Sequence, residues 1–162
     1  AGVIGYLGPF EQANASNVHE ALTINLAAPM LLTQVFLQAT RSWPVKRKVL
    51  QISSGLGRRA MAASALYCAS KAGLDHFSRC LALDEALLSN PASIVSLAPG
   101  IIDTDMQTDL RSGNPSHFPD QANFIQLKQN GSLVSPAIAA ARVLGFLARE
   151  DFGSNVVDNV RD

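Results

Sequence analysis

The alternation of short apolar segments with long helical ones constrains the fold of this chain most strongly. Residues 48–53 (KVLQIS) and 93–98 (SIVSLA) are short apolar runs, and the second ends at Pro99 and Gly100. Such runs are typical of buried strands, and strands that alternate with long helices predict a parallel sheet with crossover helices. We expect helices over residues 17–40, 65–88, 118–130 and 136–149, and strands over 48–53, 93–98 and 155–158. Ser135 before Pro136 is the expected cap of the last helix.

A parallel sheet of the nucleotide-binding type also needs a phosphate-binding turn that this sequence lacks. That turn joins a strand to a helix through a cluster of glycines. No GxGxxG cluster occurs, and SSGLGRRA offers only Gly55 and Gly57, which a simple loop explains equally well. The chain starts as if a strand had just ended. We therefore expect residues 1–162 to be the C-terminal part of one α/β, Rossmann-type doubly wound domain, with the N-terminal glycine-rich βαβ half absent from the chain.

Charge and cysteine content exclude several classes of protein. The chain has 13 Lys and Arg against 13 Asp and Glu, so no basic surplus suggests a nucleic-acid partner. Cys68 and Cys80 have no CxxC spacing, which argues against a disulfide framework or a zinc site and favours a reducing cytoplasm. The three histidines are scattered, so we expect no metal site.

Residues 21–40 form an uncharged stretch of the length that spans a membrane. The stretch also contains several polar side chains and a central proline, Pro29. We interpret it as a helix buried in protein and expect no membrane partner.

Tyr67 and Lys71 stand four residues apart in ALYCASKAG (residues 65–73), so they share one face of a helix. A free phenol has a pKa near 10, and a nearby ammonium group favours its ionised form. Lys71, together with a second positive group such as an oxidised nicotinamide ring, is expected to lower the pKa of Tyr67. The phenol then acts as a general acid toward a carbonyl oxygen. A surface lysine beside a half-buried tyrosine is the alternative.

Ser54 strengthens the catalytic interpretation because it follows the 48–53 strand directly. Ligands of such sheets bind beyond the carboxyl ends of the strands, where a serine can donate a hydrogen bond to the same carbonyl oxygen. A turn or helix-capping role is the alternative. A serine nucleophile is not favoured, since no GxSxG elbow is present.

Ser54, Tyr67 and Lys71, followed by APGIIDTDMQ, resemble the motifs of the short-chain dehydrogenase/reductase family. The AG pair that begins at Ala1 is similar to the end of the family's NNAG motif. TINL supplies Asn25, which matches the family's structural asparagine. The resemblance spans essentially the whole chain.

The resemblance implies a role for each of these residues. Hydride moves from a nicotinamide to a ketone carbon while Tyr67 protonates the oxygen, Ser54 polarises the carbonyl, and Lys71 binds the nicotinamide ribose. The implied cofactor is NADP(H), with NAD(H) as the alternative. The implied cofactor contacts are Ala1, Gly2, Ser53, Tyr67, Lys71, Pro99, Gly100, Ile102, Thr104 and Met106.

Pro29 bears on Asn25 through the geometry of the helix. Helical hydrogen bonds run from an N–H to the carbonyl four residues earlier, and proline has no N–H. The Asn25 carbonyl therefore lacks its helical partner and is free to hold a water. In the family, the backbone carbonyl of the corresponding asparagine holds a water that relays protons to the lysine. The resemblance therefore implies that Asn25 positions this water. A simple kink is the alternative.

Within the family, ALYCASKA, PGIIDTDMQ and QLKQNGSLVSP most resemble sepiapterin reductase and the bacterial benzil-reductase-like enzymes. The resemblance implies a small carbonyl substrate, sepiapterin- or benzil-like, bound by Ser54, Tyr67 and Asp158. A strand-end aspartate in solvent or paired with Arg161 is the alternative for Asp158. The segment of about residues 105–131 is expected to be a mobile substrate lid.

Two expectations concern assembly and activity as a whole. The helices over 17–40 and 65–88 are apolar well beyond one face, and Leu74, Phe77, Leu81 and Leu83 extend the second beyond what one sheet contact needs. We expect them to pair in a homodimer, as the resemblance also implies. The alternative to an enzyme is a non-catalytic fragment or scaffold that keeps the motifs without a complete cofactor site.

Overall fold

The computed structural model describes residues 2–160. The expected cofactor contact at Ala1, and Arg161 as a partner of Asp158, lie outside the described residues. The helices are α1 (Ala15–Leu22), α2 (Ala28–Thr40), α3 (Ala65–Ala86), α4 (Asp105–Ser112), α5 (Gln121–Gln129) and α6 (Pro136–Ala148), with a π-helical turn η2 (Thr23–Ala27) and the 3₁₀ turns η1 (Phe10–Gln12) and η3 (Gly55–Gly57). The strands are β1 (Arg47–Ile52), β2 (Ala92–Ala98) and β3 (Val157–Asn159).

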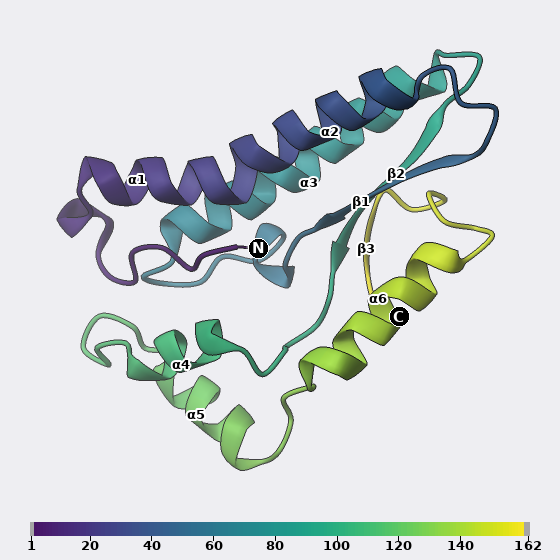
Figure 1. Ribbon diagram of the computed structural model, residues 1–162. Helices are drawn as coiled ribbons and strands as arrows, with labels where there is room; N and C mark the ends of the chain where they lie inside the picture. The colour runs from purple at the N-terminus through teal and green to yellow at the C-terminus, as the bar shows by residue number, and fades with distance from the viewer. Residues whose placement is uncertain (1, 161–162) are drawn as a thin grey trace.

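The three strands form one parallel sheet in the order β1-β2-β3. Helices cover both faces: α1, α2 and α3 lie together on one side of the sheet and α6 lies on the other (Figure 1). Val49 and Ile94 pack with Leu37 on the first face, and Val95 and Phe146 pack together on the second. Apolar side chains on both faces are what a parallel sheet requires. The predicted α/β, doubly wound architecture is confirmed.

The helix expected over 17–40 is interrupted at η2. There the backbone N–H of Ala28 donates to the carbonyl of Thr23, five residues earlier instead of four. The wider turn comes just before Pro29, which has no N–H for the helical ladder. The sequence predicted the disturbance at this proline but not its form as a π-helical turn.

The expected lid is helical and packed, which the sequence did not predict for its first half. Residues 105–112 form α4, although only Met106 and Leu110 of this helix are apolar and periodicity gave little signal. Leu110 is buried, and Phe118, which precedes α5, is only 1% exposed. Contacts with the rest of the fold therefore stabilise this segment, which lies at one end of the molecule (Figure 1).

Among the described residues, the helical run Ala15–Thr40 is long and apolar enough, by length and composition alone, to cross a membrane. The core helix of a globular protein passes the same test. Leu37 on its inner face packs against β1 and β2, but only 22% of the apolar window is buried, so the expected burial holds for one face alone. Its outer face is exposed, with Leu32 71% accessible.

Candidate active site

The carboxyl ends of β1 and β2 open into a cavity of about 830 Å³ that brings most of the predicted site residues together. Ser54 lies where β1 ends, and Tyr67 and Lys71 reach the cavity from the same face of α3. Other predicted residues that line it are Gly2, Ser53, Pro99, Gly100, Ile102, Thr104 and Met106. The position beyond the strand ends is where ligands bind in open parallel sheets.

Lys71 connects the helix to the end of the sheet. Its buried ammonium donates a hydrogen bond of 2.9 Å to the carbonyl oxygen of Ile52, the last residue of β1. Burial lowers the pKa of Lys71, and the negative charge of Asp75 opposes that change. The lysine is therefore held in place by the backbone that leads directly to Ser54.

Ser54 joins β1 to η3, and its side chain is oriented by the turn. The backbone N–H of Leu56 donates to the Ser54 hydroxyl oxygen at 3.2 Å. This bond occupies a lone pair of the oxygen and leaves the hydroxyl hydrogen available to donate. Ser54 can thus act as a donor within the cavity.

The phenol of Tyr67 has a higher pKa in this structure than a free phenol. Burial raises the pKa of its phenol above the ordinary value of 10.0, and the hydrogen bond with Ser54 lowers it by less. Desolvation of the phenolate outweighs the favourable interactions, and lowering of the pKa by Lys71 together with a second positive group stays a prediction. The Lys71 ammonium lies 5.8 Å from the centre of the tyrosine ring.

Asn25 is buried and its side chain holds the N-terminal segment in place. Its side-chain amide donates to the carbonyl of Val3 at 2.8 Å and its side-chain oxygen accepts from the N–H of Val3 at 2.9 Å. A Cβ on Gly2 would lie 3.3 Å from that same oxygen. The amide side chain therefore pairs with the backbone of Val3 through two hydrogen bonds, and the water held by the Asn25 carbonyl stays a prediction.

The segment after β2 turns sharply at Gly100, whose φ of +90° favours glycine. Ile102 then forms a bridge with Val134, and Val134 donates from its N–H to the carbonyl of Ile101 at 3.0 Å. These backbone bonds close the base of the α4–α5 segment and fix the predicted nicotinamide turn.

Several residues of the cavity were not identified from the sequence. They are Ile4, Leu56, Arg58, Arg59, Ile101, Asp105, Gln107, Leu110, Phe124 and Asn159. The signal available for the two arginines was their place in SSGLGRRA, shortly after Ser54. The apolar members come from separate elements that only the folded chain brings together.

Asp158, the predicted substrate contact, directly precedes a residue of the cavity lining. Asn159 lines the cavity, whereas the Asp158 carboxylate accepts a hydrogen bond from the N–H of Asn159 at 2.8 Å. Asp158 is part of β3, and its backbone carbonyl accepts from Arg58 at 2.9 Å.

A family model described as short chain dehydrogenase matches residues 1–115. The chain belongs to the short-chain dehydrogenase family. Among solved structures, the KRED1-Pglu enzyme superposes on this short-chain dehydrogenase with a TM-score of 0.82 at 27% identity, covering 98% of this chain and 65% of that one. The predicted family is confirmed.

Curated relatives add detail about the branch of the family. The chain is 37% identical over 152 residues to a benzil reductase ((S)-benzoin forming) of Bacillus cereus, covering 94% of this chain and 61% of the relative. It is 32% identical over 158 residues to sepiapterin reductase of Bos taurus, covering 95% of this chain and 57% of the relative. The chain thus spans less than two-thirds of the length of these relatives.

Proposed function

We propose that the protein reduces a ketone or 1,2-dicarbonyl with a nicotinamide nucleotide, Tyr67 acting as general acid. The observation that carries this proposal is the meeting of Ser54, Tyr67 and Lys71 in one cavity beyond the strand ends. The similarity to benzil and sepiapterin reductases supports carbonyl reduction.

The residues present fit a nicotinamide nucleotide. The hydroxyl of Ser53 is buried and has no hydrogen-bond partner among the described residues, so it can bind a polar group of a ligand. Gly2 leaves space beside Lys71, because a Cβ there would lie 3.9 Å from the ammonium. The turn of Pro99, Gly100, Ile102 and Thr104, with Met106, would hold the nicotinamide, and Lys71 the ribose; the implied contact at Ala1 would extend this set. The bound nucleotide would supply hydride.

Three side chains would act on the substrate oxygen. Ser54 donates a hydrogen bond to it, with its own oxygen held by the Leu56 N–H. Tyr67, which burial keeps protonated, transfers its proton to the oxygen as the alcohol forms. Lys71 then favours the resulting phenolate by its charge, and the Asn25 carbonyl positions a water through which the proton is restored.

The remaining wall of the cavity suits a substrate with an apolar or aromatic body. Ile4, Leu56, Leu110 and Phe124 face the same space as the polar groups. Such a wall resembles small-molecule sites, in which a few polar groups fix the orientation of an otherwise apolar ligand. We propose a benzil- or sepiapterin-like substrate, covered by the segment 105–131 acting as a lid.

We propose further that the protein is a cytoplasmic homodimer. α2 and α3 form an apolar groove lined in part by Met30, Leu31, Phe77 and Leu81. Leu83 is 71% exposed and supports this face, but Leu74 is 1% exposed and belongs to the core, not to the expected interface. The free cysteines Cys68 and Cys80 are compatible with a reducing compartment.

The test is a reduction assay with the full-length protein, benzil and NADPH, with NADH in a parallel reaction. We expect one NADPH consumed for each benzil converted to a hydroxyketone, and faster turnover with NADPH than with NADH. Equal rates would leave the reaction in place but remove the NADP(H) assignment. Nucleotide binding without reduction of any ketone or dicarbonyl, or no binding at all, would favour the scaffold instead.

A further inference from the structure

Asp75 is a buried carboxylate that the proposed mechanism does not use. It follows Lys71 by one turn of α3 and is only 1% exposed. One carboxylate oxygen accepts a 2.7 Å hydrogen bond from the hydroxyl of Ser96 on β2. The other has no hydrogen-bond partner among the described residues but lies 3.6 Å from Nε of Arg58. Because burial of a charge is costly unless it is compensated, this arrangement requires an explanation.

The arginine that faces Asp75 belongs to the segment that carries Ser54. Arg58 follows η3 directly, and it also donates to the carbonyl of Asp158 on β3 at 2.9 Å. Asp75 and Arg58 therefore join three parts of the site: the catalytic helix, the turn after Ser54 and the end of the last strand.

Gly57 shows how closely this turn approaches α3. A Cβ at Gly57 would lie 2.8 Å from the free carboxylate oxygen of Asp75 and 3.0 Å from the backbone carbonyl of Lys71. The turn that follows Ser54 thus rests on α3 between Lys71 and Asp75. A change at the Asp75 carboxylate would therefore alter the contact between the Ser54 turn and α3 directly.

Cationic side chains outnumber acidic ones in the lining of the cavity that contains Lys71. Arg58, Arg59 and Lys71 line the same cavity, in which Asp105 of α4 is the acidic group and Tyr67 the phenol. The N-terminal segment and the strand ends contribute only uncharged lining groups, Gly2, Ile4, Ile52, Ser53, Ala98 and Asn159. Burial lowers the pKa of Lys71, and Asp75 is the charge that opposes this.

We propose that Asp75 is a positioning residue of the active site, whose buried carboxylate anchors the Ser54 turn on α3 and keeps Lys71 in its cationic form. Its part in turnover rests on the proposed function, in which Lys71 acts as a cation. The ionisation of Lys71 itself can be measured without any reaction.

The experiment is an NMR titration of the lysine side chains in the full-length protein, with the Lys71 signal assigned by its loss in Lys71→Arg. Asp75→Asn keeps the size of the side chain and an acceptor for Ser96 but removes the charge. We expect the titration midpoint of Lys71 to fall, because a nearby opposite charge is lost. Ser96→Ala is the matched control: it removes the hydrogen bond and keeps the charge, so the midpoint should barely move.

Arg58→Gln keeps the proposal testable if Asp75→Asn does not fold. Removing this cation should raise the Lys71 midpoint, opposite to Asp75→Asn. An unchanged midpoint in Asp75→Asn, or no rise in Arg58→Gln, would overturn the proposal. In turnover, kcat for benzil reduction by Asp75→Asn should fall where Lys71 loses its charge, at a lower pH than the fall that Tyr67 sets in the parent, and a pH profile identical to the parent's would overturn the catalytic part. A parent protein without reductase activity would refute the proposed function, while the titration would still decide whether Asp75 sustains the Lys71 charge.

Discussion

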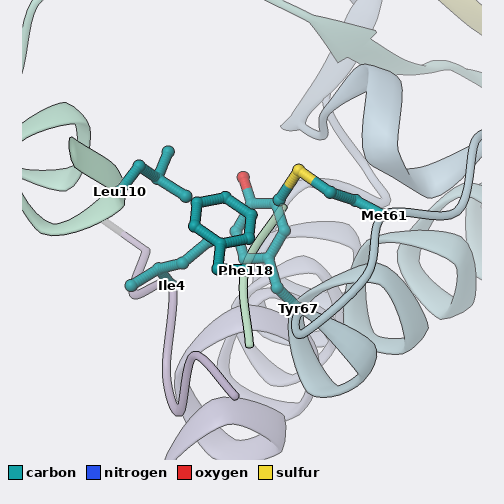
Figure 2. Packing of buried hydrophobic residues seen from close by; sticks show 5 residues of the cluster. All are labelled: Ile4, Met61, Tyr67, Leu110 and Phe118. Atoms are coloured by element: carbon teal, nitrogen blue, oxygen red, sulfur yellow. The ribbon is translucent and has the colours of Figure 1, made fainter. Parts of the chain in front are cut away.

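Phe118 packs in the same buried cluster as Tyr67, so the segment between α4 and α5 supports the ring of the proposed acid. Ile4, Met61 and Leu110 complete the cluster, and Figure 2 shows their side chains gathered around the two rings. The N-terminal segment, the loop before α3 and the lid therefore meet at the tyrosine. The position of its hydroxyl depends on all three.

Phe118→Ala should destabilise the protein strongly, because Phe118 is 1% exposed and its loss leaves a cavity beside Tyr67. Large-to-small changes of this kind cost about 3–5 kcal/mol. Chemical denaturation measures the loss, with Phe10→Ala as the control, since Phe10 is 59% exposed. A cost for Phe118→Ala no larger than that of the control would show that the lid does not pack as described.

Leu31→Lys should disrupt the proposed homodimer, because Leu31 lines the apolar groove of α2 and α3 and is 61% exposed. Introducing a charge where two apolar surfaces meet leaves it buried and unpaired. Leu144→Lys is the matched control, since Leu144 is similarly exposed but lies on α6, on the other side of the sheet. Sedimentation at micromolar concentration should show a dimer for the parent and control and a monomer for Leu31→Lys. A parent that is a monomer would rule out the interface.

The raised pKa of Tyr67 predicts opposite pH profiles for the two directions of the reaction. Reduction needs the protonated phenol. Because the pKa of Tyr67 lies above the ordinary value of 10.0, the phenol keeps its proton until the pH exceeds that raised pKa. The rate of reduction should therefore be flat through neutral pH and fall only in strongly alkaline solution. Oxidation of the alcohol needs the phenolate and should rise with pH. If both directions fell together, the controlling group would be Lys71 instead.

Asp158→Ala tests the proposed pterin contact against its neighbour. We expect a rise in KM for sepiapterin of roughly 10- to 150-fold, the cost of losing a hydrogen bond to a charged group, with little change for benzil. Asn159→Ala is the paired variant, because Asn159 lines the cavity. If only Asn159→Ala raises KM for sepiapterin, the contact belongs to Asn159. Equal small effects on both substrates would remove the pterin assignment.

Local pattern was sufficient for the elements whose residues bury a continuous apolar face. β1, β2 and α3 lie within a few residues of their expected bounds, because each strand carries a short apolar run and α3 repeats apolar residues at helical spacing. α4 was missed because two apolar residues, Met106 and Leu110, make a helix only when the rest of the fold packs against them.

The site shows the same division between local and tertiary information. Ser54, Tyr67 and Lys71 could be identified from spacing and family motifs, and the fold brings them into one cavity. The pKa of Tyr67 could not be predicted, because its direction depends on burial by Phe118 and other residues distant in sequence. A mid-helix aspartate such as Asp75 is indistinguishable in sequence from a solvent-exposed one.

The most direct measurement is kcat for benzil reduction by Tyr67→Phe in the full-length protein, with melting temperature and NADPH affinity measured alongside. Phenylalanine keeps the ring that packs in the buried cluster and removes only the hydroxyl. If Tyr67 is the general acid, kcat should fall by about 10²- to 10⁴-fold, while the melting temperature and NADPH affinity stay close to those of the parent. Retention of more than about a tenth of kcat, at unchanged stability, would contradict the assignment of Tyr67 as the proton donor.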